Sequence, residues 1–192
     1  MKWIALVILL VIVPYTAIRW HYRKPNRAFE PYADMKNQAN TVRLLSAGFQ
    51  RITLEADRPA DPLRPTDRAS IFAVPGGLPE ILAATLVEPP ELPADITAVT
   101  AAPAVNAMFA YPIGVTCTAL DNGHQLAGAH LYIRDDQMFV VPLFEKLDGT
   151  LLARSRETFA RLTVAPGALK PGRYRITVLG DRSSQSWTLE VK

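Results

Sequence analysis

Apolar and polar residues alternate along the C-terminal half of the chain with the period of two that is typical of half-buried β-strands. One such apolar set is Ile113, Val115, Cys117 and Ala119. The last two predicted strands place on their inward faces Tyr174, Ile176, Val178, Trp187, Leu189 and Val191. Turn signals separate the runs, at Asn122-Gly123, Asp135-Asp136, Asp148-Gly149 and Pro171-Gly172. The pattern predicts a mainly β protein built from consecutive antiparallel strands.

The dipeptide Asn122-Gly123 also predicts a register, because it favours a two-residue hairpin loop. The strand before it would return as residues 126–133, which places Gly128 opposite Cys117. A second turn at Asp135-Asp136 would point Met138 to the face opposite that of His130.

The run Leu169-Lys170-Pro171-Gly172-Arg173-Tyr174 resembles the entry into a late strand of immunoglobulin-like and fibronectin type III-like domains. The resemblance covers roughly the last 80 to 95 residues and implies an antiparallel β-sandwich over residues 94–192. It also implies that Tyr174 is a corner tyrosine whose hydroxyl bonds nearby backbone. The antibody-type cysteine pair is absent, so no antibody-like function is implied.

Residues 48–93 form a predicted β and loop region ahead of that module. Apolar positions at Ile52, Leu54 and Ala56 alternate with polar ones and predict a strand. Residues 70–74 predict a short strand, and residues 78–87 fit either a helix or a strand. The Pro-rich segment EPPELP, residues 88–93, marks the predicted boundary with the C-terminal module.

A short amphipathic helix is predicted between Pro31 and Gly48, within a link that spans residues 21–47. Its apolar positions recur at spacings of three and four: Tyr32, Met35, Ala39, Val42 and Leu45. This stripe has two interpretations. The helix either packs on the β module, which is the more common use of such a stripe, or docks on a partner's membrane subunit.

The N-terminal segment is uncharged from residue 3 to residue 18 and predicts a single transmembrane helix within an anchor at residues 1–20. As a helix the span reaches roughly 24 Å, and Trp3 and Trp20 bracket it. A cleaved signal peptide is the alternative, since Lys2 supplies a basic start. Cleavage after Ala17 would however put bulky Tyr15 where a small residue is required, which favours an uncleaved signal-anchor.

The orientation of this predicted anchor rests on two conflicting signals. Four or five basic residues come after the span and one lysine precedes it, which by the positive-inside rule keeps the globular part in the cytoplasm. The Met-Lys start is typical of a signal-anchor that exports the rest of the chain, and we adopt that interpretation. It predicts a single-pass protein of the plasma (inner) membrane whose globular part is extracytoplasmic.

Composition and charge narrow the choice of partners. The 192-residue chain has 16 prolines, which favours short strands and ordered loops. Five of its 21 basic residues lie in the first 27 residues, which leaves 16 basic and 18 acidic residues in the rest. A module with a net charge of −2 argues against nucleic acid, and the basic cluster fits anionic lipid headgroups instead. The expected partners are thus the lipid bilayer, through residues 3–18, and a membrane protein.

No nucleotide, zinc-protease or serine-hydrolase motif occurs, and we predict no catalytic, cofactor-binding or metal-binding residues. A serine hydrolase would need His124 or His130 as its base, because His21 lies beside the predicted anchor. Thiol, imidazole and thioether groups that suit copper occur at Cys117, His124, His130 and Met138, but the predicted hairpin separates Cys117 from His124. With a single cysteine, an intrachain disulfide is impossible.

The predicted function is a non-enzymatic, membrane-anchored accessory or interaction subunit that binds or stabilises a partner complex at the membrane surface. A copper-handling assembly factor for a respiratory oxidase is the alternative, and the chain is similar in layout to small anchored proteins of that kind. A hydrolase is a third hypothesis.

Overall fold

The computed structural model describes residues 12–15, 31–59, 67–147, 153 and 155–192. Residues 38–192 form one compact unit, which is distinct from the unit of residues 1–37. Two helices and the first four strands are α2 (Pro31–Ser46), β1 (Gln50–Asp57), β2 (Phe72–Pro75), α3 (Glu80–Thr85), β3 (Asp95–Thr100) and β4 (Ala104–Val105). The remaining strands are β5 (Tyr111–Thr118), β6 (His124–Arg134), β7 (Gln137–Lys146), β8 (Glu157–Val164), β9 (Gly172–Val178) and β10 (Ser183–Val191).

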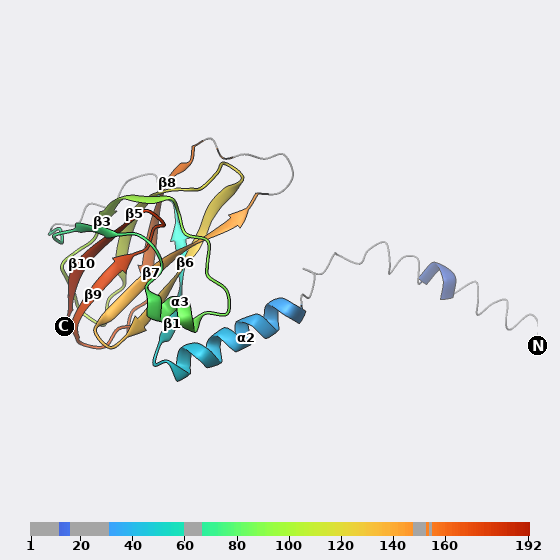
Figure 1. Ribbon diagram of the computed structural model, residues 1–192, viewed down its shortest axis with the longest axis horizontal. Coiled ribbons are helices and arrows are strands. Elements are labelled where there is room, and N and C mark those ends of the chain that lie inside the picture. The colour runs from blue at the N-terminus through green and yellow to red at the C-terminus, as the bar shows by residue number, and fades with distance from the viewer. Residues whose placement is uncertain (1–11, 16–30, 60–66, 148–152, 154) are drawn as a thin grey trace, which may run out of the picture. The chain divides into compact units, whose positions relative to one another are not determined.

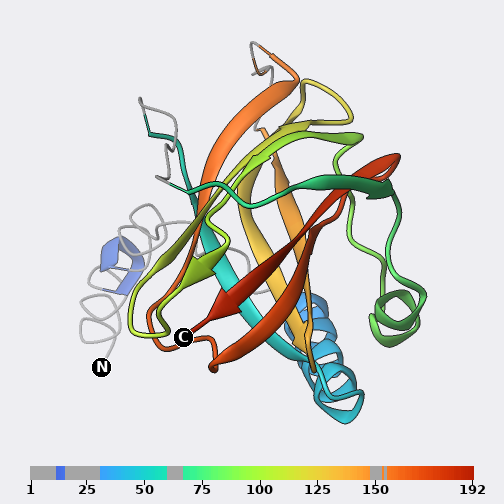
Figure 2. The same ribbon diagram turned by 90° about the vertical axis from the view of Figure 1, so that its left-hand side faces the viewer.

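Eight strands close into a mixed β-barrel (Figures 1 and 2). Their order is β10, β3, β5, β8, β1, β6, β7 and β9, and β9 pairs back onto β10. Two of the pairings, β7 with β9 and β10 with β3, are parallel, and the other pairings in the ring are antiparallel. The short strands β2 and β4 pair with β10 in addition.

The immunoglobulin-like sandwich predicted over residues 94–192 is therefore wrong, although the mainly β class is confirmed. Strand β1, from the region before the Pro-rich segment, lies between β8 and β6 and bridges them. This insertion, together with the β9–β10 pairing, closes the sheet on itself and removes the open edges that two stacked sheets would have. The Tyr174 hydroxyl nevertheless donates to the Lys170 carbonyl at 3.0 Å, as the local motif implied.

The predicted strand faces are confirmed by burial in the barrel. Ile113, Val115 and Cys117 are buried in the main core. Leu54 is also buried there, and Ile52 and Ala56 pack against the same core. On the last two strands, Ile176, Val178, Trp187, Leu189 and Val191 belong to the core and Tyr174 packs against it.

The predicted hairpin at Asn122-Gly123 is wrong. Strand β5 pairs with β3 and β8, so Cys117 lies opposite Ile96 and Thr158 and not opposite Gly128. The hairpin at Asp135-Asp136 is confirmed, because Arg134 pairs with Gln137 across it. Met138 points into the main core. His130 pairs with Val141 of β7, whose side chain lies on the other face of that strand, so Met138 and His130 lie on opposite faces as predicted.

A second, smaller apolar cluster lies outside the barrel wall. It joins the C-terminal part of α2 and helix α3 to the outer faces of the strands through Leu44, Phe49, Leu82, Leu86, Tyr132, Val141 and Leu179. Helix α2 is present as predicted, but it packs through Leu44. The described members of the predicted apolar stripe face the solvent instead: Ala39 is exposed, and Met35, Val42 and Leu45 are 70%, 62% and 66% exposed.

The transmembrane helix predicted for residues 3–18 is not borne out by the structure. Only residues 12–15 of that span are described, and they are helical. Within the described residues no helix has the length and apolar character needed to cross a membrane. The rest of the predicted span lies outside the described residues, as does most of the basic link after it.

Candidate functional site

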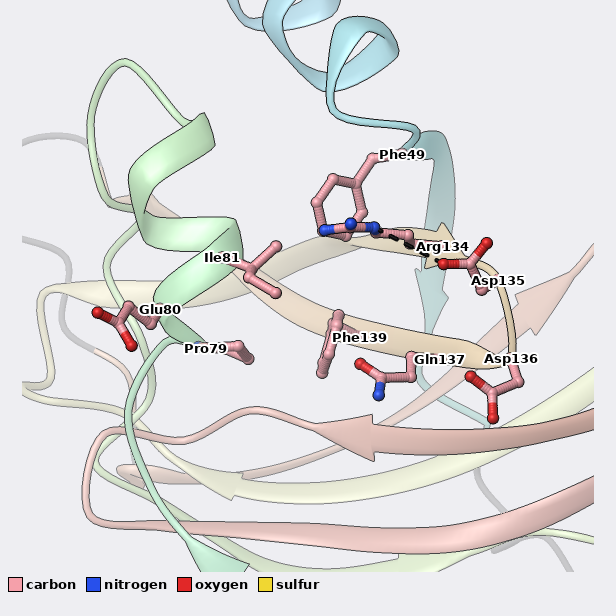
Figure 3. A pocket seen from close by; sticks show the side chains of 9 residues that line it. All are labelled: Phe49, Pro79, Glu80, Ile81, Arg134, Asp135, Asp136, Gln137 and Phe139. Atoms are coloured by element: carbon pink, nitrogen blue, oxygen red, sulfur yellow. Dashed lines mark ion pairs between the residues drawn. The ribbon is translucent and has the colours of Figure 1, made fainter.

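A groove of about 360 Å³ opens between helix α3 and the turn that joins β6 to β7 (Figure 3). Its volume lies at the lower end of the range for ligand pockets. The lining residues come from the residue before β1, from α3 and its N-cap, and from the hairpin: Phe49, Pro79, Glu80, Ile81, Arg134, Asp135, Asp136, Gln137 and Phe139.

The β6–β7 turn forms the polar side of the groove and is held rigidly. Asp135 adopts a left-handed backbone, with φ of 54°, which a two-residue hairpin loop requires and which aspartate tolerates better than most residues. The backbone N–H of Arg175 on β9 donates to the Asp136 carbonyl at 2.8 Å. The turn is therefore fixed to the neighbouring strand β9 by its backbone.

Three apolar side chains form the floor and the opposite wall. Phe139 points outward because Met138, its neighbour on β7, points into the barrel core. Leu82 is completely buried and holds α3 against the wall, so that the adjacent Ile81 stays 55% exposed and faces the groove (Figure 3). Phe49 is only 2% exposed and lies beneath Arg134.

The charges on the rim are predominantly acidic. The Arg134 guanidinium lies 5.5 Å from the centre of the Phe49 ring, and its Nε is 3.8 Å from a carboxylate oxygen of Asp135. The Arg134 guanidinium therefore already makes a cation–π contact with Phe49 and an ion pair with Asp135. Within the described part of the chain no ion pair involves Glu80 or Asp136. A further cation, Arg175 of β9, pairs in register with the lining residue Gln137.

This arrangement suits binding of a group that is apolar in one part and cationic in another. The aromatic and aliphatic walls would bury the apolar part, and the carboxylates of Glu80 and Asp136 would attract the cation. The nine lining residues include no serine, cysteine, histidine or lysine, so the groove itself offers carboxylates but no nucleophile of those types.

A second pocket, of about 90 Å³, surrounds His124, one of the two candidate bases for a hydrolase. The Nδ1 atom of His124 lies 2.7 Å from an Asp121 carboxylate oxygen. This contact, with the Gly123 N–H, holds the pKa of the Asp121 carboxyl below its ordinary value. A serine hydrolase needs a hydroxyl on the other side of the imidazole. The pocket is lined by Glu91, Leu92, Leu120, Asp121, His124 and Phe144, and none of these supplies one.

The other candidate base, His130, lies on the outer face of β6. Its ring centre is 6.0 Å from that of Tyr132, in an edge-to-face arrangement. Its Nδ1 atom is buried and has no hydrogen-bond partner among the described residues. Burial, and secondarily the charge of Arg51, lower the pKa of His130.

The four residues considered for copper lie in different environments. Cys117 and Met138 belong to the barrel core, His130 lies on the outside of β6, and His124 begins that strand beside the Asp121 turn. Across the described residues no three His, Cys, Asp or Glu side chains are grouped closely enough to hold a metal ion. The copper-handling and hydrolase hypotheses stay predictions.

Comparison with known proteins gives no relative from which a function is transferable. No protein-family model matches the chain, and no curated protein or solved structure is significantly similar to it.

Proposed function

We propose that this protein is a non-enzymatic interaction module that binds a segment of a partner protein in the groove beside α3. The observation that carries the proposal is the preformed combination of apolar surface, chiefly from Ile81 and Phe139, with an acidic rim. The partner segment would present one large apolar side chain flanked by lysine or arginine.

Most of the binding free energy should come from the large apolar side chain of the partner segment. Full burial of a leucine or phenylalanine side chain contributes roughly 1.5–3 kcal/mol. A solvent-exposed ion pair contributes only about 0.2–1 kcal/mol, so Glu80 and Asp136 would chiefly select basic over acidic segments. The 55% exposure of the Ile81 side chain supports this proposal, which specifies the accessory role expected from the sequence. The predicted location at the plasma (inner) membrane stays a prediction.

Fluorescence anisotropy with labelled decapeptides tests the proposal on the full chain. One peptide holds a leucine followed by two arginines, and its control holds two glutamates in their place. The basic peptide should bind, and Ile81→Asp or Asp136→Lys should weaken binding by about tenfold or more. Ala98→Asp, at an exposed position of β3, serves as the matched control and should bind as the unmodified protein does. Equal binding of both peptides, or no effect of Ile81→Asp, would refute the proposal.

A further inference from the structure

The end of the barrel beside the C-terminal strand carries an uncharged surface that we call the apolar tip, residues 104–110 and 165–167. The surface is uncharged because both segments lie in stretches without charged residues, from residue 96 to residue 120 and from residue 162 to residue 169. Met108 and Phe109 are 75% and 68% exposed, the highest values among the large apolar side chains of the described residues apart from Met35. Exposed apolar surface of this kind marks an interaction site.

The apolar tip is an ordered structure. The side chain of Asn106 accepts a hydrogen bond from the Met108 N–H at 2.9 Å, and its carbonyl accepts one from the Phe109 N–H at 2.9 Å. The Gly167 N–H donates to the Ala107 carbonyl at 2.7 Å and joins the two segments of the tip. Met108 and Phe109 are thus presented on a turn whose backbone groups are largely paired, which lowers the cost of moving it out of water.

Basic side chains flank the apolar tip. Lys192 is tied to it, because its N–H donates to the Val105 carbonyl and its own carbonyl accepts from the Ala107 N–H. Lys170 comes after the second segment of the tip, and Arg173, the second residue of β9, pairs with Glu190 of β10. All four side chains are exposed. Three of these four side chains are cationic and one is a carboxylate, and they flank an uncharged centre.

We propose that the apolar tip inserts into the surface of an anionic lipid bilayer. Met108 and Phe109 would enter the boundary between headgroups and acyl chains, while Lys170, Arg173 and Lys192 would contact anionic headgroups. The charge pattern favours lipid over protein, since basic residues near an anionic surface each strengthen binding and an uncharged centre avoids the cost of placing charge in hydrocarbon. This contact is independent of the groove and of residues 3–18.

A fluorophore placed on the tip of the full chain tests the proposal. Met108→Cys provides the attachment site for an environment-sensitive maleimide dye, and Asn122→Cys, in an exposed turn beyond the other end of β5, provides the control. The native Cys117 is completely buried and burial raises its pKa to about 11, so it does not compete for the dye. Any membrane binding by residues 3–18 is common to both labelled proteins and does not distinguish them.

With vesicles of mixed phosphatidylglycerol and phosphatidylcholine, the dye at position 108 should shift to the blue and be quenched by spin labels on the acyl chains. The dye at position 122 should show neither change. Lys170→Gln and Lys192→Gln should each lower the ratio of inserted to free dye by about fivefold. An unshifted dye at position 108, or equal quenching at both positions, would overturn the proposal. A dye at position 108 that responds only to membranes carrying their native proteins would assign the tip to a protein partner and also overturn it.

Discussion

The indole N–H of Trp187 donates a hydrogen bond to the Tyr111 hydroxyl at 3.0 Å inside the barrel, and that hydroxyl donates in turn to the Ala102 carbonyl at 2.8 Å. The two side chains come from β10 and β5, which are not neighbours in the sheet. Burial raises the pKa of Tyr111 far above its ordinary value, so the phenol stays protonated and keeps its donor. The chain of hydrogen bonds satisfies the polar atoms of two large side chains in an otherwise apolar core.

Replacement of Trp187 by alanine should lower the free energy of unfolding by roughly 3–5 kcal/mol, the range for truncating a buried large aromatic residue. Trp187→Phe should cost less, roughly 1–3 kcal/mol, because it keeps most of the packing and loses the hydrogen bond to Tyr111. Thr188→Ala, at the exposed adjacent position, should stay within about 0.5 kcal/mol. Urea unfolding followed by circular dichroism measures all three. A Trp187→Ala variant as stable as Thr188→Ala would contradict the barrel register.

His130 should make the protein less stable in acid. Its pKa is lowered in the folded state, so the unfolded chain binds a proton more readily as the pH falls below about 6.5. Stability is therefore lost on going below that pH and levels off below the folded pKa. His130→Phe removes both the titration and the unpaired Nδ1, and should shrink the difference in unfolding free energy between about pH 7.5 and pH 5.

The control for this effect is His124→Gln, which alters the histidine beside Asp121 and leaves His130 in place. If His130→Phe and His124→Gln show the same dependence of stability on pH as the unmodified protein, burial of His130 has no energetic consequence in this range.

Cys117 should be unreactive in the folded protein. Its side chain is completely buried, and burial raises the thiol pKa from 9.0 to about 11, which alone lowers the thiolate fraction near neutral pH by about a hundredfold. Ellman's reagent should therefore detect no thiol in the native protein and one thiol per chain in guanidinium. Rapid reaction without denaturant would mean that the β5 segment opens on the timescale of the assay.

Gly180 should not tolerate a side chain. A Cβ atom at this position would lie 2.3 Å from the Ser183 carbonyl oxygen and 3.2 Å from Ile96, so backbone must move. We expect Gly180→Ala to lower the free energy of unfolding by roughly 1–3 kcal/mol. Gly123→Ala is the matched control, because the nearest atom there is the flexible Asp121 side chain at 3.4 Å. Thermal melts that fail to separate the two variants would contradict the close approach.

Local sequence pattern was sufficient to identify the buried side of β1, β5, β9 and β10, because side chains alternate across a strand whatever its neighbours are. Leu54, Ile176 and Trp187 were assigned correctly for that reason. The Asp135-Asp136 turn was likewise predictable, since a two-residue loop between alternating runs is a local property. Tyr174 shows the limit of such local information: its bond to Lys170 is present, but the sandwich inferred from it is not.

The pairing of the strands could not be predicted in the same way. Strand β5 pairs with β3 and β8 and not with β6, the next strand in the chain. In the closed barrel each strand of the ring has backbone hydrogen-bond partners along both of its edges. Packing of α3 and the start of the β1 segment on the outer wall brings Phe49, Ile81 and Phe139 from three separate segments to one groove.

The packed face of α2 also depended on the tertiary structure. Burial of Leu44 with Phe49 and Leu82 outweighed the more regular stripe that contains Val42 and Leu45. Periodicity defines a face locally, whereas pairing and packing depend on contacts between residues far apart in the chain.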